Sequence, residues 1–193
     1  MGLRYVVITS VSRDDLPDGG AMQFVRTISA IRRRMPDVKI EILTPDFNGD
    51  IESLKKVLDA QPDVFNHNVE TIRRLYYKVR PQANYERSLN VLRNAKKIAP
   101  EIKTKSGLML GLGESLEEVI DLFKDLRSVD CDFLTIGQYL RPSKKNLPVV
   151  KYITPEVFDE LRQKALEFGF EFVASGPLVR SSMNAEEMYN KIG

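Results

Sequence analysis

Cysteine and histidine are nearly missing from this sequence, which has one of each, Cys131 and His67, in 193 residues. One cysteine excludes a disulfide within the chain, and it excludes a metal or cluster site built from several cysteines of this chain. No apolar run approaches the roughly 18 residues that a helix needs to cross a bilayer. The first residues lead directly into a strand-like run, so we expect no signal peptide. These absences predict a cytoplasmic protein that does not insert in a membrane.

A strong excess of one charge is also missing. The chain has 29 basic and 27 acidic residues, for a formal net charge of +2. Nucleic-acid-binding domains usually carry a clear basic excess, so nucleic acid is not an expected partner. The length suits one domain with a substantial core. Residues 141–153 form a long, basic, proline-containing stretch, which we interpret as a functional or docking loop rather than a domain boundary.

Two hydrophobic periodicities alternate along the chain, and they predict strands separated by helices. The predicted strands cover residues 5–9, 39–43, 64–67, 107–110, 133–136 and 170–174. The predicted helical stripes run from Phe24 to Met35, Ile51 to Leu58, Tyr85 to Ala99, Val119 to Leu126, and Phe158 to Phe168. This alternation favours parallel strands with right-handed crossovers, as in a doubly wound open sheet or in a full or partial β/α barrel.

The ends of the predicted helices carry capping signals. Ser115 and Glu118 have the spacing of a capping box, in which each side chain satisfies a free backbone donor of the other residue. Thr154 precedes Pro155, which predicts an N-cap followed by a first-turn proline, and Gly169 predicts a left-handed helix stop.

Polar residues follow every predicted strand. These clusters are residues 9–20, 44–46, 66–70, 111–114, 138–141 and 175–177. Parallel strands bring their carboxyl ends to the same edge of a sheet, and both candidate architectures bind ligands at that edge. Six clusters together therefore predict a mouth that is lined for a polar ligand.

Most of these clusters also have a structural interpretation. Residues 18–20, Asp-Gly-Gly, fit a tight turn and helix cap as well as a ligand contact. A single histidine is more often a satisfied core group than a base or ligand, and Cys131 is best explained by burial. Gly111 and Gly113 lack the full spacing of a phosphate loop. Residues 66–70 are harder to explain, because two asparagines, a histidine and a glutamate at the end of a buried strand need polar partners.

Several segments together resemble lipoyl synthases, which belong to the radical S-adenosylmethionine enzymes. They include Pro-Asp-Val-Phe-Asn-His-Asn-Val-Glu-Thr at 62–71 and Gly-Leu-Met-Leu-Gly-Leu-Gly-Glu at 107–114. The remaining segments are residues 5–10, 13–21, 41–47, 78–81, 104–106, 134–140 and 174–182. They span nearly the whole chain in the order of the family.

The resemblance implies an α/β fold, a partial β/α (TIM-like) barrel of the radical S-adenosylmethionine type. It implies one domain over residues 1–193, with a C-terminal tail at 176–193. The implied activity is that of a sulfurtransferase, which inserts sulfur at two carbons of a protein-bound octanoyl group to give the lipoyl cofactor. The implied cofactors are S-adenosylmethionine and two [4Fe-4S] clusters. The implied partner is an octanoylated lipoyl-carrier domain, either a dehydrogenase E2 subunit or a glycine-cleavage H protein.

The chain departs from the family pattern because both cysteine motifs that hold the clusters are absent. The likeness begins at what would be the second barrel strand. We therefore expect a barrel without its first strand, and a chain that is inactive on its own. The alternative is a non-radical barrel that acts as a small-molecule-binding module or as an aldolase-like enzyme.

The resemblance also implies roles for individual residues. The segment Ser12, Arg13, Asp14 and Asp15 would hold the methionine amino group, since a carboxylate suits an ammonium ion. Ribose hydroxyls would bind to Asn68 and Glu70, and the methionine carboxylate would bind to Arg80. Adenine would rest on the glycine-containing strand with Gly107, Met109, Gly111 and Glu114. Arg180 would close the mouth, and Ser182, with Ser181 as the alternative, would be the fourth ligand of one cluster.

Overall fold

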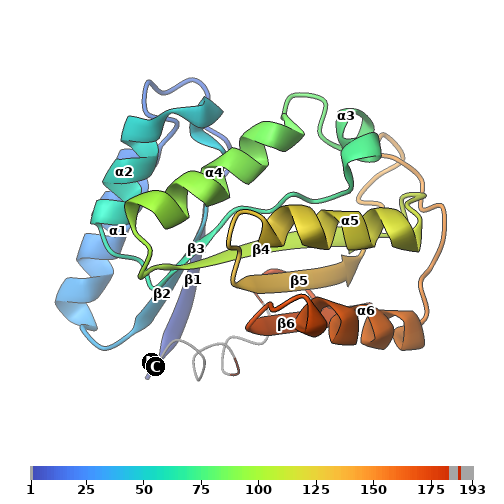
Figure 1. Cartoon of the computed structure of the whole chain (residues 1–193). Coiled ribbons are helices and arrows are strands. Elements are labelled where there is room, and N and C mark those ends of the chain that lie inside the picture. The colour runs from blue at the N-terminus through green and yellow to red at the C-terminus, as the bar shows by residue number, and fades with distance from the viewer. Residues whose placement is uncertain (1, 183–186, 188–193) are drawn as a thin grey trace.

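The computed structural model of the protein describes residues 2–182 and 187. Within these residues, six parallel strands form one sheet in the order β1-β2-β3-β4-β5-β6. The strands are β1 (Tyr5–Thr9), β2 (Lys39–Leu43), β3 (Val64–Asn66), β4 (Lys103–Leu110), β5 (Phe133–Gln138) and β6 (Phe172–Gly176). The strand direction turns strongly from β1 to β6, and these two strands are the edges of the sheet (Figure 1).

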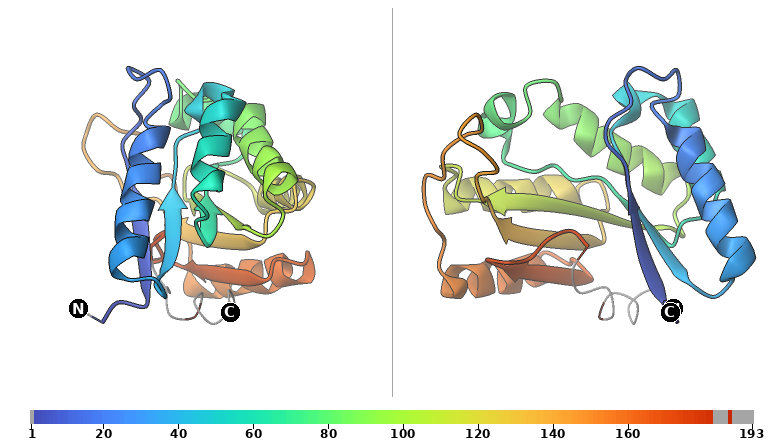
Figure 2. Two further views of the ribbon diagram at one scale, coloured as in Figure 1. Left: turned by 90° about the vertical axis from the view of Figure 1, so that its left-hand side faces the viewer. Right: turned by 180° about the vertical axis from the view of Figure 1, so that it is seen from behind.

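Helices connect successive strands and cover the outer face of the sheet in every view (Figure 1, Figure 2). The longer helices are α1 (Ala21–Arg34), α2 (Ile51–Asp59), α4 (Tyr85–Ile98), α5 (Leu116–Arg127) and α6 (Pro155–Glu167). Short helical turns are η1 (Phe47–Gly49), η2 (Arg73–Leu75) and α3 (Tyr76–Val79). This arrangement is an unclosed β/α barrel, so the predicted architecture is confirmed.

The outer face of the sheet is mostly apolar and is covered by helices, although β1 at the edge is only partly buried. Alternate strand residues such as Ile42, Phe65 and Leu134 belong to one large buried cluster, together with Leu92 and Phe123 from the helices. Burying a side chain of this size contributes about 1.5–3 kcal/mol relative to leaving it exposed. Most of the core therefore lies between the sheet and the helices.

The inner face carries the intervening strand residues, which are of mixed character. A small apolar cluster of Val64, Phe133, Phe172 and Ala174 lines one part of it. Successive strand residues point to opposite faces, so the inner face also receives the charged residues of β2 and β4. The functional groups described below lie on this face and at the strand ends.

Several predicted element boundaries need correction. Strand β4 begins at Lys103, four residues earlier than predicted, because Lys103 and Lys105 interrupt the apolar run without ending the strand. Strand β6 begins at Phe172 rather than at residue 170, and β5 extends to Gln138. The helical turns of η2 and α3 were not predicted at all. Residues 183–186 and 188–193 of the predicted tail lie outside the described residues.

The predicted helix ends are mostly confirmed. Ser115 and Glu118 form a complete capping box at the start of α5, and Gly169 has a φ of 92° after α6. Pro155 is in the first turn of α6, but the Thr154 side chain makes no capping hydrogen bond. Asp18 accepts hydrogen bonds from two backbone amides at the start of α1, which supports the turn and cap interpretation of that cluster.

Candidate functional site

A cavity of about 310 Å³ opens on the inner face near the carboxyl ends of the strands. Its wall combines residues of β2, β4 and β5 with the segment after β3 and the chain that follows β6. The lining residues are Leu43, Asn68, Glu70, Gly107, Leu108, Met109, Thr135, Gly137, Gln138, Leu140, Val179, Arg180 and Ser181. The structure thus brings together five of the predicted binding residues, and it adds Ser181, the alternative cluster ligand.

Gly107 keeps the wall of this cavity open. A Cβ atom at this position would lie 2.6 Å from Thr135 Oγ1 and 2.9 Å from Asn68 Oδ1, closer than real Cβ contacts come. Any larger residue would displace these two polar side chains or project into the cavity. Glycine therefore allows close approach to the backbone of β4, as a flat ligand would require.

Asn68 and Glu70 supply polar groups that fit a hydroxyl-bearing ligand. Asn68 Oδ1 is buried and has no hydrogen-bond partner among the described residues, and an unsatisfied acceptor costs about 1–3 kcal/mol. Glu70 has a left-handed backbone with a φ of 67° and forms a bridge to Leu108 of β4. Burial raises the pKa of the Glu70 carboxyl, while Arg80 acts in the opposite direction. A ligand that donates hydrogen bonds here would satisfy both side chains.

A second cavity, of about 170 Å³, lies beside the first and shares Leu43, Asn68 and Glu70 with it. Its other lining residues follow β1, β2 and β3, except for Arg80, which follows α3; they are Thr9, Ser10, Ser12, Thr44, Pro45, His67 and Arg80. Asn68 and Glu70 therefore lie between two adjoining spaces. Such a site suits an elongated ligand with polar groups near its middle.

Arg80 is held at the second cavity by two hydrogen bonds. Its Nη1 donates to the Asn68 backbone oxygen at 2.9 Å and to Tyr76 Oη at 2.8 Å. The guanidinium carbon also lies 5.6 Å from the centre of the Tyr76 ring. Arg80 is thus a fixed cation that a ligand carboxylate could approach.

Tyr76 is itself the end of a buried hydrogen-bond relay that starts at His67. His67 Nδ1 lies 3.0 Å from the Thr44 backbone oxygen, which can only accept, so Nδ1 carries the proton. Nε2 then accepts from Ser88 Oγ at 2.9 Å, and Ser88 Oγ accepts from Tyr76 at 2.7 Å. The Tyr76 oxygen is left to accept from Arg80. Every donor in the relay is therefore determined by one backbone carbonyl.

The relay requires a neutral His67. Burial lowers the pKa of this histidine to about 4, which keeps it uncharged near neutral pH. The side chain is 1% exposed and both ring nitrogens have partners. His67 is accordingly a satisfied core group, the structural interpretation of the sequence.

A buried ion pair occupies the inner face on the amino-terminal side of the first cavity. Lys105 Nζ lies 3.0 Å and 3.1 Å from the two Glu41 carboxylate oxygens, and both side chains are fully buried. Glu41 also accepts from Tyr5 at 2.6 Å and from Asn66 at 2.8 Å. Burial lowers the pKa of Lys105, and the Glu41 carboxylate opposes this shift.

Lys105 also fixes the chain that follows β6. Its ammonium donates to the Ser181 backbone oxygen at 2.6 Å. Ser181 and Arg180 line the first cavity, and Ser182 is exposed at the end of this described segment. The assignment of Ser182, or Ser181, as a cluster ligand stays a prediction of the resemblance.

The segment predicted to hold the methionine amino group is divided in the structure. Arg13 and Asp15 are exposed and pair with each other through two hydrogen bonds. Ser12 and Asp14 line a third cavity of about 220 Å³ together with Arg80. Among these four residues, only Ser12 also lines the second cavity, and the role of the segment stays a prediction.

Gly111 and Glu114 lie in the turn after β4 and do not line the first cavity. The Glu114 carboxylate accepts from the backbone amides of Gly111 and Leu112, at 2.5 Å and 2.9 Å. Gly111 has a φ of 99°, a conformation that favours glycine. In this structure the two residues shape the turn, and their predicted contact with adenine stays untested.

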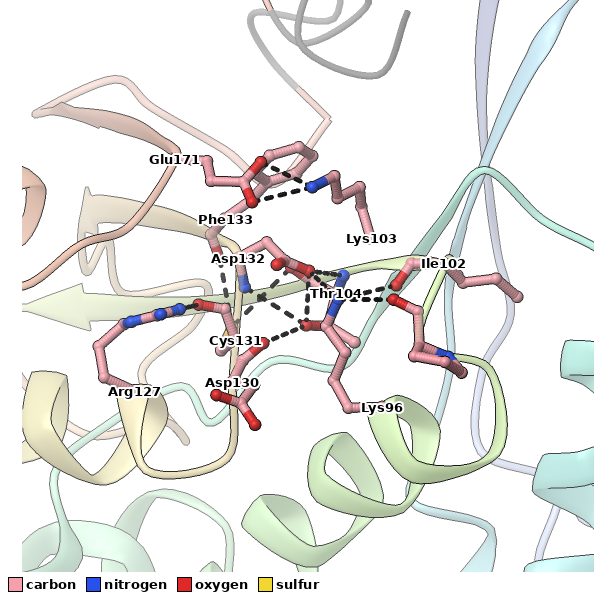
Figure 3. Close-up of polar contacts among 11 residues, drawn as sticks. Lys96, Ile102, Lys103, Thr104, Arg127, Asp130, Cys131, Asp132, Phe133 and Glu171 are labelled. Atoms are coloured by element: carbon pink, nitrogen blue, oxygen red, sulfur yellow. Dashed lines mark hydrogen bonds and ion pairs between the residues drawn. The ribbon is translucent and has the colours of Figure 1, made fainter.

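Cys131 has the structural role that its sequence context suggested. Its sulfur is fully buried and lies 3.4 Å from the Phe133 backbone oxygen, at the amino-terminal end of β5 (Figure 3). Burial raises the pKa of the thiol to about 12, so no thiolate forms near neutral pH. Within residues 2–182 and 187, no group of histidine, cysteine and acidic residues could hold a metal ion.

Sequence reasoning missed the polar groups that support the site rather than line it. Glu41 and Lys105 each interrupt an apolar strand run, and that paired interruption was the available signal. Ser88 and Tyr76 gave no signal, because each falls in a segment whose pattern is otherwise that of an ordinary helix or loop.

The comparison with known families defines the class of this barrel. The profile of the radical SAM superfamily matches residues 1–126. The solved structure of methylornithine synthase has a TM-score of 0.63 at 17% identity, over 95% of this chain and 60% of that chain. A maturase of the [FeFe]-hydrogenase has a TM-score of 0.63 at 14% identity, over 97% and 48%. The chain belongs to the radical SAM superfamily.

Within that superfamily, the chain is similar to lipoyl synthases. It is 56% identical over 191 residues to the lipoyl synthase of Alkaliphilus metalliredigens, covering 99% of this chain and 66% of that protein. It is 58% identical over 187 residues to the lipoyl synthase of Rubrobacter xylanophilus, covering 97% and 58%. The resemblance inferred from the sequence is confirmed. The chain spans 58 to 66% of the length of these relatives.

Proposed function

We propose that this chain is the S-adenosylmethionine-binding barrel of a lipoyl synthase. The complete enzyme would insert sulfur at two carbons of an octanoyl group attached to a carrier protein. Membership of the radical SAM superfamily and the identity of 54 to 58% to curated lipoyl synthases support this proposal. The activity of the whole enzyme is part of the proposal, because the chain spans 58 to 66% of the length of these relatives.

The pair of adjoining cavities is the observation that carries the proposal. S-adenosylmethionine has a flat adenine, a ribose with two hydroxyls, and a methionine end with an ammonium and a carboxylate. The first cavity offers the backbone approach at Gly107, and the second offers Arg80. Asn68 and Glu70 lie between them, where the ribose would be. The residues present therefore fit this cofactor.

Each group of the cofactor would meet a partner of suitable chemistry. Ribose hydroxyls would donate to the Glu70 carboxylate and to the unsatisfied Asn68 Oδ1. The methionine carboxylate would pair with the Arg80 guanidinium. Ser12, which lines the second cavity, would face the methionine ammonium. When bound, S-adenosylmethionine would supply the radical chemistry for which the superfamily is named.

Iron–sulfur clusters are a different case. The family implies [4Fe-4S] clusters, which are held by several cysteine thiolates. Cys131 is the single cysteine, and it is buried at the end of β5 away from the cavities. The residues of this chain do not fit such a group, so no chemical step through a cluster is assigned to them here.

The proposed macromolecular partner is a lipoyl-carrier protein that bears an octanoyl chain. A dehydrogenase E2 subunit and a glycine-cleavage H protein are the two carriers we propose, and the cytoplasm is the proposed compartment. No helix in the described part of the chain is long and apolar enough to cross a membrane. The aldolase-like alternative has only a fold likeness, to a deoxyribose-phosphate aldolase with a TM-score of 0.55 at 10% identity.

Calorimetric titration of the purified chain with S-adenosylmethionine tests the proposal. We expect saturable one-to-one binding. Glu70→Gln should weaken binding about tenfold or more, because hydrogen bonds to a charged group contribute about 1.5–3 kcal/mol. Glu117→Gln, in an exposed first turn of α5, is a matched control that should leave affinity unchanged. Equal affinity of both variants and the parent chain would contradict the assignment of the site.

A further inference from the structure

The connection between β5 and α6 concentrates positive charge. Residues 139–154 contain four basic side chains and no acidic one, although the whole chain has a net charge of only +2. The basic residues are Arg141, Lys144, Lys145 and Lys151. We call residues 139–154 the basic loop.

Three of these cations have no acidic partner among residues 2–182 and 187. Lys144, Lys145 and Lys151 are exposed, and no ion pair joins any of them to an acidic residue of the described chain. Arg141 has an internal role, because its Nε donates to the Asn146 backbone oxygen at 2.9 Å and so stabilises the turn. The loop thus presents three lysine ammonium groups to a potential partner.

The basic loop is held in place by hydrogen bonds to the barrel. Gln138 Nε2 donates to the Lys151 backbone oxygen at 3.1 Å, and Gln138 Oε1 accepts from the Ile153 amide at 2.9 Å. The Val150 amide donates to the Gly111 backbone oxygen at 2.8 Å. A surface that is already ordered loses little conformational entropy when a partner binds.

The basic loop also exposes large apolar side chains beside the site. Leu140 is 47% exposed and lines the first cavity, while Val150 and Tyr152 are 65% and 68% exposed. Aromatic residues such as Tyr152 are enriched at protein interfaces, whose rims are polar and solvent-accessible. In Figure 2 the loop stands out from the barrel as the orange segment before α6.

The loops after β1 and β2 lack the positive charge of the basic loop. Residues 10–20 contain three acidic side chains and one basic one, and residues 44–50 contain two acidic and none basic. Two of these carboxylates are paired, because Arg13 pairs with Asp15 and Arg87 pairs with the buried Asp46. A partner with an acidic surface would therefore be attracted to the basic loop more than to these loops, and this difference would favour one orientation of the partner at the mouth.

We propose that the basic loop is the docking surface for a small acidic protein domain, which presents a lysine-linked octanoyl chain to the entrance of the first cavity at Leu140. This inference rests on the proposed function and adds to it the location and charge of the partner site. The three lysines would contact carboxylates of the domain. Tyr152 and Val150 would cover its apolar surface, and Leu140 would contact the acyl chain at the entrance.

The test uses the full chain and an octanoylated dehydrogenase lipoyl-carrier domain as the probe, with affinity measured by calorimetry at about 50 and about 300 mM salt. The variant Lys144→Glu/Lys145→Glu/Lys151→Glu should weaken binding about tenfold or more and should reduce its salt dependence. The variant with arginine at the same three positions should bind as the parent chain does.

The matched control is Arg33→Glu/Arg34→Glu/Lys55→Glu, which makes the same change in net charge on exposed positions of α1 and α2. It should bind within about twofold of the parent. An equal loss in the control would overturn the proposal, because long-range charge alone would then explain the effect. Unchanged affinity of the loop variant for the carrier domain would also overturn the proposal. So would an RNA oligonucleotide that binds the parent chain more tightly than the carrier does and loses affinity in the loop variant.

Two further measurements separate this inference from the proposed function. S-adenosylmethionine should bind the loop variant and the parent equally, and so should a short peptide that carries octanoyl-lysine without the acidic domain. If the chain binds S-adenosylmethionine but does not bind the carrier, the docking surface is wrong and the proposed cofactor site stands. If S-adenosylmethionine does not bind, the proposed function fails independently of the loop.

Discussion

The two faces of the same sheet differ in the buried side chains that they carry. The outer face is a continuous apolar layer under the helices, with residues such as Phe65 and Leu134 fully buried. The inner face buries Glu41, Asn66 and Lys105, a carboxylate, an amide and an ammonium group. Desolvating charges is unfavourable, so the inner face carries these groups at a cost in stability. Most of the apolar burial is therefore on the outer face, whereas the buried charged groups that hold the chain after β6 are on the inner face.

Removing one member of the buried ion pair should have the largest effect on this contrast. In Lys105→Met the Glu41 carboxylate keeps its bonds to Tyr5 and Asn66 but loses its counter-ion. An uncompensated buried charge costs about 3–5 kcal/mol, which urea unfolding would measure. Lys105→Met/Glu41→Gln removes that charge as well and should recover most of the loss. A double variant as unstable as the single one would contradict this explanation.

Acid should destabilise the fold through the buried His67. Because the pKa of His67 is lowered to about 4, the unfolded chain binds a proton in the range between the ordinary histidine pKa and pH 4, whereas the folded chain does not. Stability is therefore complete above that window and falls as the pH falls through it, by about 3 kcal/mol for this group.

The measurement is urea unfolding from neutral pH down to about pH 4.5, compared between the parent chain and His67→Gln. The variant should be less stable at neutral pH because it disturbs the relay to Ser88, but its stability should fall less on acidification. Parallel pH profiles would contradict a neutral, buried His67.

Adding a side chain at Gly107 in the first cavity should weaken the binding of S-adenosylmethionine more than it destabilises the fold. In Gly107→Ala the added methyl group would meet Thr135 Oγ1 and Asn68 Oδ1 at 2.6 Å and 2.9 Å. We expect S-adenosylmethionine affinity to fall about 10- to 100-fold, equivalent to about 1.4–2.8 kcal/mol. Gly2→Ala, where a Cβ would meet nothing within 4 Å, is the control. Calorimetric titration that gives equal affinities would contradict the cavity assignment.

The relay that joins the outer face to the mouth should give the smallest effect. Tyr76→Phe removes the hydroxyl that links Ser88 to Arg80, but Arg80 keeps its hydrogen bond to the Asn68 backbone oxygen, so we expect a loss of about 1 kcal/mol. S-adenosylmethionine should bind about fivefold more weakly. Methylthioadenosine, which lacks the methionine carboxylate, should bind unchanged. Tyr77→Phe is the matched control, since Tyr77 is 67% exposed. Equal losses for the two ligands would show that the relay does not act through Arg80.

The apolar residues of the outer face could largely be predicted from the sequence, whereas the buried polar residues of the inner face could not. Repeated apolar positions identified every strand and every long helix, because that pattern reflects the dominant burial. Lys103 and Lys105 concealed the first half of β4, since partners that justify a buried charge come from distant strands. The polar ends of the strands were predicted to converge, and they do. Which polar residues line a cavity depends on the geometry of the turns, which the sequence pattern does not give. Glu114 binds backbone amides of its own turn and Arg13 pairs with Asp15, so neither lines the first or second cavity.

The anchor between Lys105 and residue 181 has a consequence for how this protein can vary over time. The Lys105 ammonium donates a hydrogen bond to the main-chain carbonyl of residue 181, a group that every amino acid provides. Substitution at position 181 therefore leaves the acceptor in place, and the side chain there is free to be selected for other purposes. Lys105 and Glu41 have no such freedom, because their contact depends on side-chain charge. Substitutions should therefore be tolerated at position 181 and selected against at Lys105 and Glu41.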